Sequence, residues 1–195
     1  MVTRGLFLVG VLGGLFSSFE AVGYESRAYE VTESDGVFEV RDYPSVVVAE
    51  TVLPGEFDDV GSNAFRMLFR YISGSNEPSQ EIAMTTPVTQ QAKGDRYKVA
   101  FLMPSEYTLG SLPAPGDERI EIRSEQGGRF ACVRYSGFWS QSNYEKNLSR
   151  LQTWISQRGF EVVGEPVWAR YDPPFKPWCM RRNEIWLPIA EPGLL

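Results

Sequence analysis

The chain has few of the residues that usually carry catalysis. Among its 195 residues there is no histidine, and the only cysteines are Cys132 and Cys179. Without histidine there is no Ser-His-Asp or Cys-His triad, and no histidine-ligated zinc, copper or iron site. Two cysteines are too few for a four-cysteine zinc or iron–sulfur site in one chain. The adjacent acids Asp58 and Asp59 are best interpreted as solvated charge, so the residues give no positive support for an enzyme.

A predicted helix over residues 55–72 carries the most suggestive binding residues. Its apolar side chains spread over roughly 200° of the helix surface at 100° per residue, which is wider than one packed face usually needs. Phe65 and Phe69 lie on the outer edge of this arc, and Arg66 and Arg70 lie just beyond it. Two interpretations stay open. Either loops cover the helix on two sides, or the surplus edge borders a ligand groove with an arginine near its mouth.

A second helix is predicted from Asn143 to about Gln157, and its pattern is simpler. Its apolar residues fall within an arc of about 60°, which is typical of a helix that packs one face on a core. Ser142 and Glu145 have the spacing of a capping box at its start. The apolar stripe consists of Tyr144, Leu148, Leu151 and Ile155.

The remaining segments predict strands around these two helices. Residues 29–31 are expected to pair with residues 37–41, and residues 119–123 with residues 130–135 across Gly127-Gly128. Each half of the chain then follows the order strands, helix, strands. This indicates an α+β domain: a distorted antiparallel β-barrel of two pseudo-repeated halves, flanked by two α-helices. Further strands are predicted at residues 46–52, 82–90, 97–103, 160–171 and 180–188.

The first 23 residues are interpreted as a signal peptide or an N-terminal anchor, followed by one domain over residues 24–195. Arg4 precedes an apolar run at residues 5–16, and small residues at 21–23 offer a cleavage site before Tyr24. The run is too short for a comfortable membrane span, so no span is expected in the mature domain. A periplasmic or secreted location follows, with a membrane anchor as the alternative. A disulfide between the two cysteines would be allowed there but not required.

Composition adds two further bounds. The chain is 43% hydrophobic and 13% aromatic, as expected for a globular domain with a real core. Its formal net charge is −6, which argues against non-specific binding to nucleic acid, because that needs a basic stripe.

Five motifs, in a fixed order and with the two helices between them, resemble the SOUL/heme-binding protein family over about residues 29–189. The most specific are the two near the end of the chain. The motifs are FEVRDY at 38–43, IAMTTPVT at 82–89, FLMP at 101–104, YDPPFKP at 171–177 and RRNEIW at 181–186.

The resemblance implies a barrel of two similar halves that binds heme or another tetrapyrrole non-covalently, without general enzymatic activity. It makes Lys176, in the YDPPFKP motif, the candidate rim cation. Phe65, Phe69 and Arg66 complete the predicted site, but they come from the helix pattern. Some members of the family are described as using a histidine ligand, and this chain has none. Heme iron would therefore take a cysteine, methionine or tyrosine ligand, Cys179 being one candidate, or no protein ligand.

Two other functions are weighed against heme binding. One is a ligand-free structural or protein-interaction module on the same fold, since a fold does not fix a function. The other is an enzyme that acts on a tetrapyrrole, for example by removing its metal. Within the motifs, Met84 to Pro87 are expected mainly to shape a strand entry, with Pro87 at an edge or bulge. Arg182 and Glu184 alternate on one strand face and are expected to form an ion pair of structural value.

Overall fold

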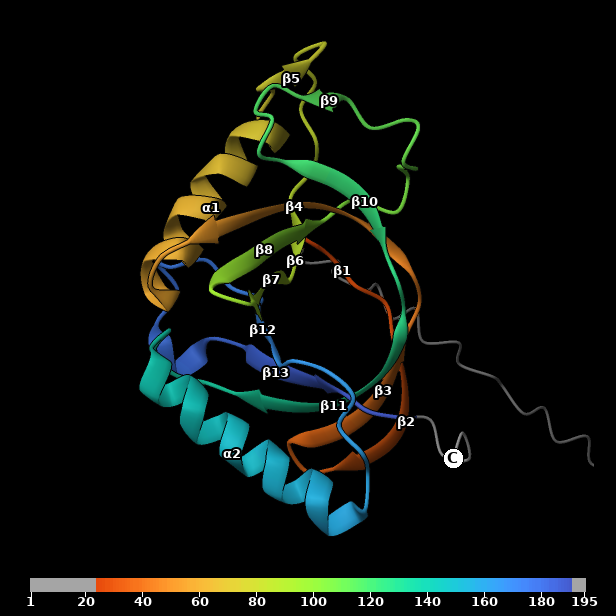
Figure 1. The fold of residues 1–195 in the computed structure, drawn as a ribbon, viewed down its shortest axis with the longest axis vertical. Coiled ribbons are helices and arrows are strands. Elements are labelled where there is room, and N and C mark those ends of the chain that lie inside the picture. The colour runs from red at the N-terminus through yellow and green to blue at the C-terminus, as the bar shows by residue number, and fades with distance from the viewer. Residues whose placement is uncertain (1–23, 191–195) are drawn as a thin grey trace, which may run out of the picture.

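The computed structural model describes residues 24–190, and it has the α+β architecture that the sequence predicts. A nine-stranded antiparallel sheet curls into a half-barrel, and both helices pack on the same side of it (Figure 1). The sheet comprises β2 (Glu30–Asp35), β3 (Phe38–Tyr43), β4 (Val46–Pro54), β7 (Val88–Lys93), β8 (Arg96–Leu102), β10 (Glu121–Glu125), β11 (Gly128–Tyr135), β12 (Val167–Arg170) and β13 (Asn183–Pro188). The helices are α1 (Phe57–Ile72) and α2 (Gln141–Arg158), and η1 (Trp178–Met180) is a single 3-10 turn. Two small sheets pair β1 (Glu25–Ser26) with β6 (Thr85–Thr86), and β5 (Asn76–Glu77) with β9 (Ala114–Pro115).

The strand order shows how the two halves correspond. It runs β10-β4-β8-β7-β12-β13-β11-β3-β2, with every neighbouring pair antiparallel. The order β4-β8-β7 on the α1 side is mirrored by β11-β13-β12 on the α2 side. The predicted pseudo-repeat is therefore visible in the topology, and β7 and β12 join the two halves at the centre of the sheet.

One predicted strand pairing is wrong, because β10 and β11 are consecutive parts of one extended segment that pairs antiparallel with the segment formed by β3 and β4. Residues 119–123 do not pair with residues 130–135: β10 joins β4, while β11 joins β3. The chain leaves β3 through Pro44 and Ser45, and it leaves β10 through Gly127, whose N–H donates to the Ser45 hydroxyl at 3.2 Å. A Cβ on Gly127 would lie 2.1 Å from the Tyr43 carbonyl oxygen, so only glycine fits where the two segments pass each other. The predicted pairing of residues 29–31 with 37–41 is present as β2 with β3, with a bulge.

Helix α1 begins two residues later than predicted, after Gly55, which has a φ of 131°. Asp58 and Asp59 occupy its first turn, where negative charge is favourable near the helix N-terminus. Its sheet-facing side packs on β4 and β8 and is closed to solvent. The buried residues of this side are Val60, Gly61, Ala64, Leu68, Tyr71 and Ile72.

Helix α2 begins earlier than predicted, because Ser140 rather than Ser142 is its N-cap. The Ser140 hydroxyl accepts a hydrogen bond from the Asn143 N–H at 3.3 Å, and the predicted capping box does not form. At the other end Gly159 adopts the left-handed conformation that ends many helices. Leu151 is fully buried against the sheet, as predicted, whereas Leu148 is half-buried at the edge of the same cluster.

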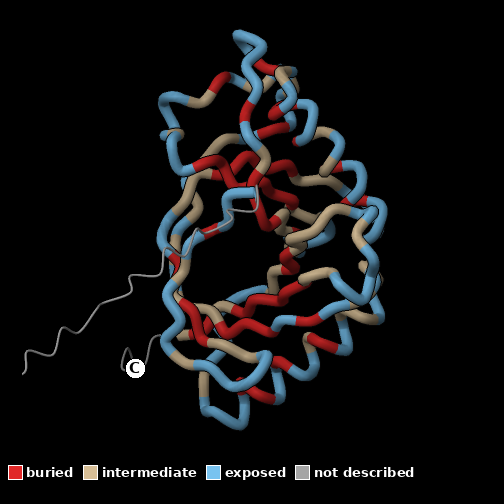
Figure 2. Tube along the Cα trace, turned by 180° about the vertical axis from the view of Figure 1, so that it is seen from behind, coloured by how far each residue is buried: buried red, intermediate tan, exposed pale blue. Residues whose placement is uncertain are grey.

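Side chains alternate between the two faces of the sheet. Ile185 and Leu187 of β13 join the apolar cluster under α2. Their neighbours Glu184 and Trp186 point to the opposite face, where Trp186 packs with Cys132. Buried positions follow the strands and the sheet-facing sides of the helices, and exposed positions follow the turns (Figure 2). The two faces thus differ in chemistry: the face under the helices is mainly apolar, and the opposite face buries the Arg41–Glu184 ion pair.

Two other predicted strands differ from the structure. The strand predicted at residues 160–171 is reduced to β12, because Gly164 and Pro166 lie in the irregular approach to it. The strand predicted at residues 82–90 is interrupted at Pro87, where Thr85 and Thr86 pair in parallel with β1 and β7 begins beyond. The predicted signal peptide or anchor lies outside the described residues. Within residues 24–190, no helix is long and apolar enough to cross a membrane.

Candidate functional site

The predicted aromatic edge of α1 is present as a stacked pair. The rings of Phe65 and Phe69 lie 5.8 Å apart, with an angle of 11° between their planes. Phe65 is half-buried and contacts Phe101 of β8, with 5.3 Å between the ring centroids. Phe69 is 47% exposed. Phe65 thus anchors the pair to the core, and Phe69 presents its ring to solvent.

The predicted cations lie on two different elements. Arg66 is exposed on α1 and donates to the Asn63 side chain at 2.5 Å. Lys176 follows β12 in a loop, and its ammonium group is 2.6 Å from a carboxylate oxygen of Asp172. The structure therefore brings Phe65 and Phe69 together with Arg66 on one helix. The contacts of Lys176 lie within its own loop.

The loop between β12 and β13 presents a second apolar surface, made of side chains that are not among the predicted site residues. Phe175 is 85% exposed, Met180 66% and Trp178 51%. Trp178 stacks on Phe138, which is itself 59% exposed, with 5.2 Å between the rings. The signal in the sequence is the run of large apolar residues in FKPWCM, from which only Lys176 and Cys179 were considered as heme contacts.

Arg181 holds this loop in place. Its Nε donates to the Lys176 carbonyl at 2.8 Å, a second guanidinium nitrogen donates to the Pro174 carbonyl, and the group lies 4.5 Å from the Trp139 ring centroid. The Gly137 N–H also donates to the Trp178 carbonyl at 3.0 Å. The loop is therefore a structured surface beside the start of α2.

The two cysteines differ in accessibility. Cys132 is fully buried, and burial raises the pKa of its thiol, so a thiolate is disfavoured there. Cys179 is exposed, and both cysteines are free. Between them, only Cys179 can offer sulfur at the surface, next to the exposed Met180. Among the described residues, no group of three or more His, Cys, Asp or Glu side chains is placed to hold a metal ion.

The RRNEIW motif has a structural role on the opposite face of the sheet. The Arg41 guanidinium donates to both carboxylate oxygens of Glu184, at 2.7 and 3.2 Å. Trp186, Tyr171 and Arg182 also donate to this carboxylate. Burial alone would raise the pKa of Glu184, but the hydrogen bonds and charges of the arginines outweigh burial and lower it. The predicted Arg182–Glu184 pair is present at 2.7 Å, as part of this buried cluster.

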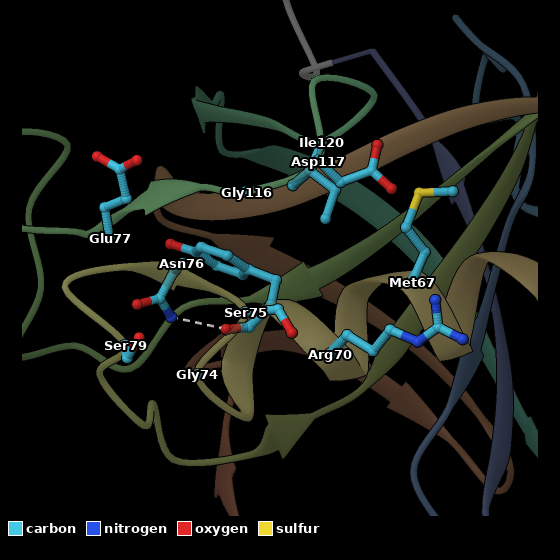
Figure 3. Close-up of a pocket in the computed structure, with 11 residues that line it drawn as sticks. Met67, Arg70, Gly74, Ser75, Asn76, Glu77, Ser79, Gly116, Asp117 and Ile120 are labelled. Atoms are coloured by element: carbon cyan, nitrogen blue, oxygen red, sulfur yellow. Dashed lines mark hydrogen bonds between the residues drawn. The ribbon is translucent and has the colours of Figure 1, made fainter.

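A pocket of about 410 Å³ lies at the C-terminal end of α1 (Figure 3). It contacts α1 through Met67, Arg70 and Tyr71, on the flank away from the Phe65–Phe69 pair. Asp117 contributes a carboxylate whose pKa is lowered to about 2 by its hydrogen bonds with Arg119. Polar and acidic groups make this pocket a poor match for an apolar macrocycle that carries carboxylates of its own.

Comparison with known proteins decides the family. The model of the SOUL heme-binding protein family matches residues 24–188. The chain belongs to this family. Mouse heme-binding protein 1 is 30% identical over 176 residues, which cover 86% of this chain and 85% of the relative. Human heme-binding protein 2 is 30% identical over 164 residues, 78% of each chain. Both relatives are named as binding proteins.

Solved structures share the fold at low sequence identity. The C-terminal domain of EcmrR aligns with a TM-score of 0.63 and 10% identity, over 84% of this chain and 98% of that domain. An uncharacterized conserved protein from Listeria innocua aligns with a TM-score of 0.60 and 11% identity, over 78% of this chain and 92% of that protein. These similarities show the fold alone. The ligand of this chain has to be inferred from its own residues and from its family.

Proposed function

We propose that this chain binds heme or a closely related tetrapyrrole non-covalently, as a carrier or buffer and not as an enzyme. The observation that carries the proposal is the match to the SOUL heme-binding family over nearly the whole described chain, together with relatives that are named heme-binding proteins. The N-terminal apolar run supports export, so the ligand would be held in the periplasm, outside the cell or at a membrane anchor.

The site we propose is the outer edge of α1. The stacked rings of Phe65 and Phe69 offer a flat apolar surface of the kind that a macrocycle can cover. Burial of apolar area contributes about 25 cal/mol per Å², so contact with these rings would supply most of the affinity. Arg66 is exposed beside them, and its guanidinium can pair with a propionate. Lys176 lies in the loop that also carries Cys179 and pairs there with Asp172, so it stays a candidate from the family motif and is not a contact that the α1 edge supplies.

The iron would be held without histidine, because the chain has none. The buried Cys132 is unsuited as a ligand, whereas Cys179 and Met180 are exposed but belong to the loop and not to α1. We therefore propose that binding at α1 depends on ring contact and propionate pairing. An affinity near micromolar, about −8 kcal/mol, is expected, with no bis-histidine spectrum.

A titration with ferric heme, followed in the Soret band, tests this proposal with matched variants. Phe69→Asp and Phe175→Asp each place a charge on an exposed phenylalanine, one on α1 and one on the loop. We expect Phe69→Asp to weaken binding strongly and Phe175→Asp to leave it nearly unchanged. Lys176→Ala should weaken the free energy of heme binding by only about 0–1 kcal/mol, since an ion pair with a propionate would be partly solvated.

Three outcomes would contradict parts of the proposal. A wild-type chain without a saturable Soret shift would favour a ligand-free module. Normal binding by Phe69→Asp with loss in Phe175→Asp would move the site to the loop. Loss of metal from a bound metalloporphyrin during the titration would indicate an enzyme.

A further inference from the structure

We propose that Arg170 binds the carboxylate of a small aromatic acid in the cleft where the N-terminal ends of α1 and α2 meet. This site is separate from the heme surface proposed on the outer edge of α1. The ends of both helices and the chain around η1 come together on one side of the sheet in Figure 1.

Arg170 is a half-buried cation without an anionic partner. One of its terminal nitrogens donates to the Gln90 side-chain oxygen at 2.8 Å, and its Nε is shielded from solvent with no hydrogen-bond partner. The guanidinium lies 4.0 Å from the Trp168 ring and 5.4 Å from the Trp139 ring. Within residues 24–190, no carboxylate lies within ion-pair distance of it. Burial lowers the pKa of Arg170 to about 10, which shows how poorly its charge is compensated.

Two neutral donors beside Arg170 are also unsatisfied. The Tyr135 hydroxyl and the Trp168 indole N–H are buried, with residue exposures of 8% and 1%. Burial raises the pKa of the Tyr135 hydroxyl, and the Trp168 N–H lies close enough to act against that rise, but neither group has a hydrogen bond of normal geometry. The neutral Tyr135 hydroxyl also lies near enough to Arg170 for the two groups to interact electrostatically. This cluster thus holds more donors than acceptors, which is the arrangement that an anionic ligand would complete.

Gln90 connects this cluster to an aromatic cleft. Its side-chain oxygen accepts from Arg170, and its side-chain nitrogen donates to the Phe57 carbonyl at 2.7 Å. Gln90 also lines a cleft of about 140 Å³, whose walls include Phe57, Tyr97 and Tyr144. Phe57 stacks on Trp168 with 4.5 Å between the rings. Arg170, Tyr135 and Trp168 do not line this cleft themselves, so a ligand carboxylate reaches Arg170 only when the Gln90 side chain turns aside. The carboxylate then takes the place of the Gln90 oxygen as the acceptor for Arg170, while the ring of the ligand packs among the aromatic walls.

The backbone and the local charges narrow the ligand to a monoanion. Phe57 and Gln141, the first residues of the two helices, both line this cleft, and the N-terminal end of a helix favours a negative group nearby. A Cβ on Gly61 would lie 2.9 Å from the Arg170 terminal nitrogens, so glycine allows the guanidinium to approach the helix backbone. Glu145 lines the cleft, and the charge of Asp58 also acts on Arg170. These carboxylates would repel a ligand with several negative charges.

Benzoate is the probe for this proposal, and benzamide is its neutral control of the same shape. We expect benzoate to bind the full chain one to one by calorimetry, with a change in tryptophan fluorescence because Trp168 and Trp139 flank Arg170. Benzamide should bind at least about tenfold more weakly, since it lacks the charge that Arg170 pairs with. Arg170→Gln should lose at least about tenfold in affinity for benzoate, whereas Arg134→Gln, at an exposed arginine of β11, should bind like the wild type.

Two further variants keep the test decisive if Arg170→Gln does not fold. Tyr135→Phe should fold and bind benzoate several-fold more weakly. Gln90→Glu places a carboxylate next to Arg170 and should abolish benzoate binding. The proposal is overturned if wild-type chain shows no saturable benzoate binding, if benzamide binds equally well, or if Tyr135→Phe and Gln90→Glu bind normally. Displacement of benzoate by ferric heme would show that the site is not separate from the heme surface.

Discussion

Two arginines on opposite faces of the same sheet are held in opposite ways. Arg41 is buried, and its guanidinium contacts Glu184, Glu39 and the Tyr43 hydroxyl at 2.6 to 3.2 Å. Burial alone would lower its pKa, but the hydrogen bond and charge of Glu184 outweigh burial and raise it. Arg170 has one amide oxygen and two indole rings around it, and its pKa is lowered to about 10.

The difference separates a structural charge from one that is available to a ligand. The Arg41–Glu184 cluster satisfies its own donors and acceptors, so it fixes β3 against β13 and leaves nothing for another molecule. The Arg170 cluster has hydrogen-bond donors without acceptors, on the face of the sheet that carries the helices. Burial of an arginine is therefore no guide to its role until its partners are counted.

The largest effect on stability is expected from breaking the Arg41–Glu184 cluster, whose hydrogen-bond donors and acceptors are satisfied. Arg41→Met removes the main partner of Glu184 and leaves a fully buried carboxylate with incomplete compensation. We expect the free energy of unfolding to fall by about 3–5 kcal/mol, measured from guanidinium chloride denaturation. A loss below about 1 kcal/mol would show that Arg182 alone can hold Glu184.

The apolar layer under α2 gives the next largest effect. Leu151→Ala should destabilise the protein by about 2–5 kcal/mol, because it opens a cavity in a fully buried position. Leu148→Ala should cost less, since Leu148 is half-buried at the margin of the cluster. Denaturant midpoints for the two variants test this order, and equal losses would contradict the packing of α2 described above.

The pH dependence of stability offers a second test of the Arg41–Glu184 cluster. The pKa of Glu184 is lowered from its ordinary value of 4.5 by Arg41 and Arg182, against the effect of burial. A lowered carboxyl pKa contributes stability that is fully present above that ordinary value and is lost as the pH falls through the folded-state pKa. Unfolding free energies measured from pH 7 to pH 3 should fall less steeply for Glu184→Gln than for the wild type. Parallel curves would exclude this carboxylate as a source of acid sensitivity.

The smallest effect is expected at the unsatisfied cluster. Arg170→Met removes a charge that lacks an anionic partner and keeps most of the apolar bulk of the side chain. Its free energy of unfolding should stay within about 1 kcal/mol of the wild type or rise, because replacing a poorly compensated charge by an apolar group is often neutral or stabilising. A loss as large as that of Arg41→Met would contradict the contrast between the two arginines.

The sequence predicted the family and the fold class well because these depend on local patterns. The apolar stripes marked both helices, and runs of strand-forming residues marked β3, β4 and β8 to within a few positions. The pairing of β10 with β4 and of β11 with β3 was not predicted, since it depends on the close approach of Gly127 to the Tyr43 carbonyl. A hairpin prediction joins strands that are neighbours in sequence, and no local signal shows that β10 and β11 form one extended segment that pairs with β3 and β4.

Much of the candidate site was beyond prediction for a related reason. The edge formed by Phe65 and Phe69 was found because both residues lie on one helix, where spacing fixes direction. Arg170 and Tyr135 come from β12 and β11, and only the tertiary fold shows that they lack partners. The exposure of the Phe175 and Met180 side chains was likewise not predicted, because the sequence does not show whether an apolar residue in a loop is buried or exposed.

The most direct test of the central claim is to map bound ferric heme by NMR. The paramagnetic iron broadens nearby amide signals, so the position of the broadening identifies the site in a spectrum of the labelled protein. If heme lies on the outer edge of α1, the amides around Phe65 and Phe69 should be broadened first, and those around Asp117 should keep their intensity. Broadening centred on residues 173–180, with the α1 amides unaffected, would contradict the account.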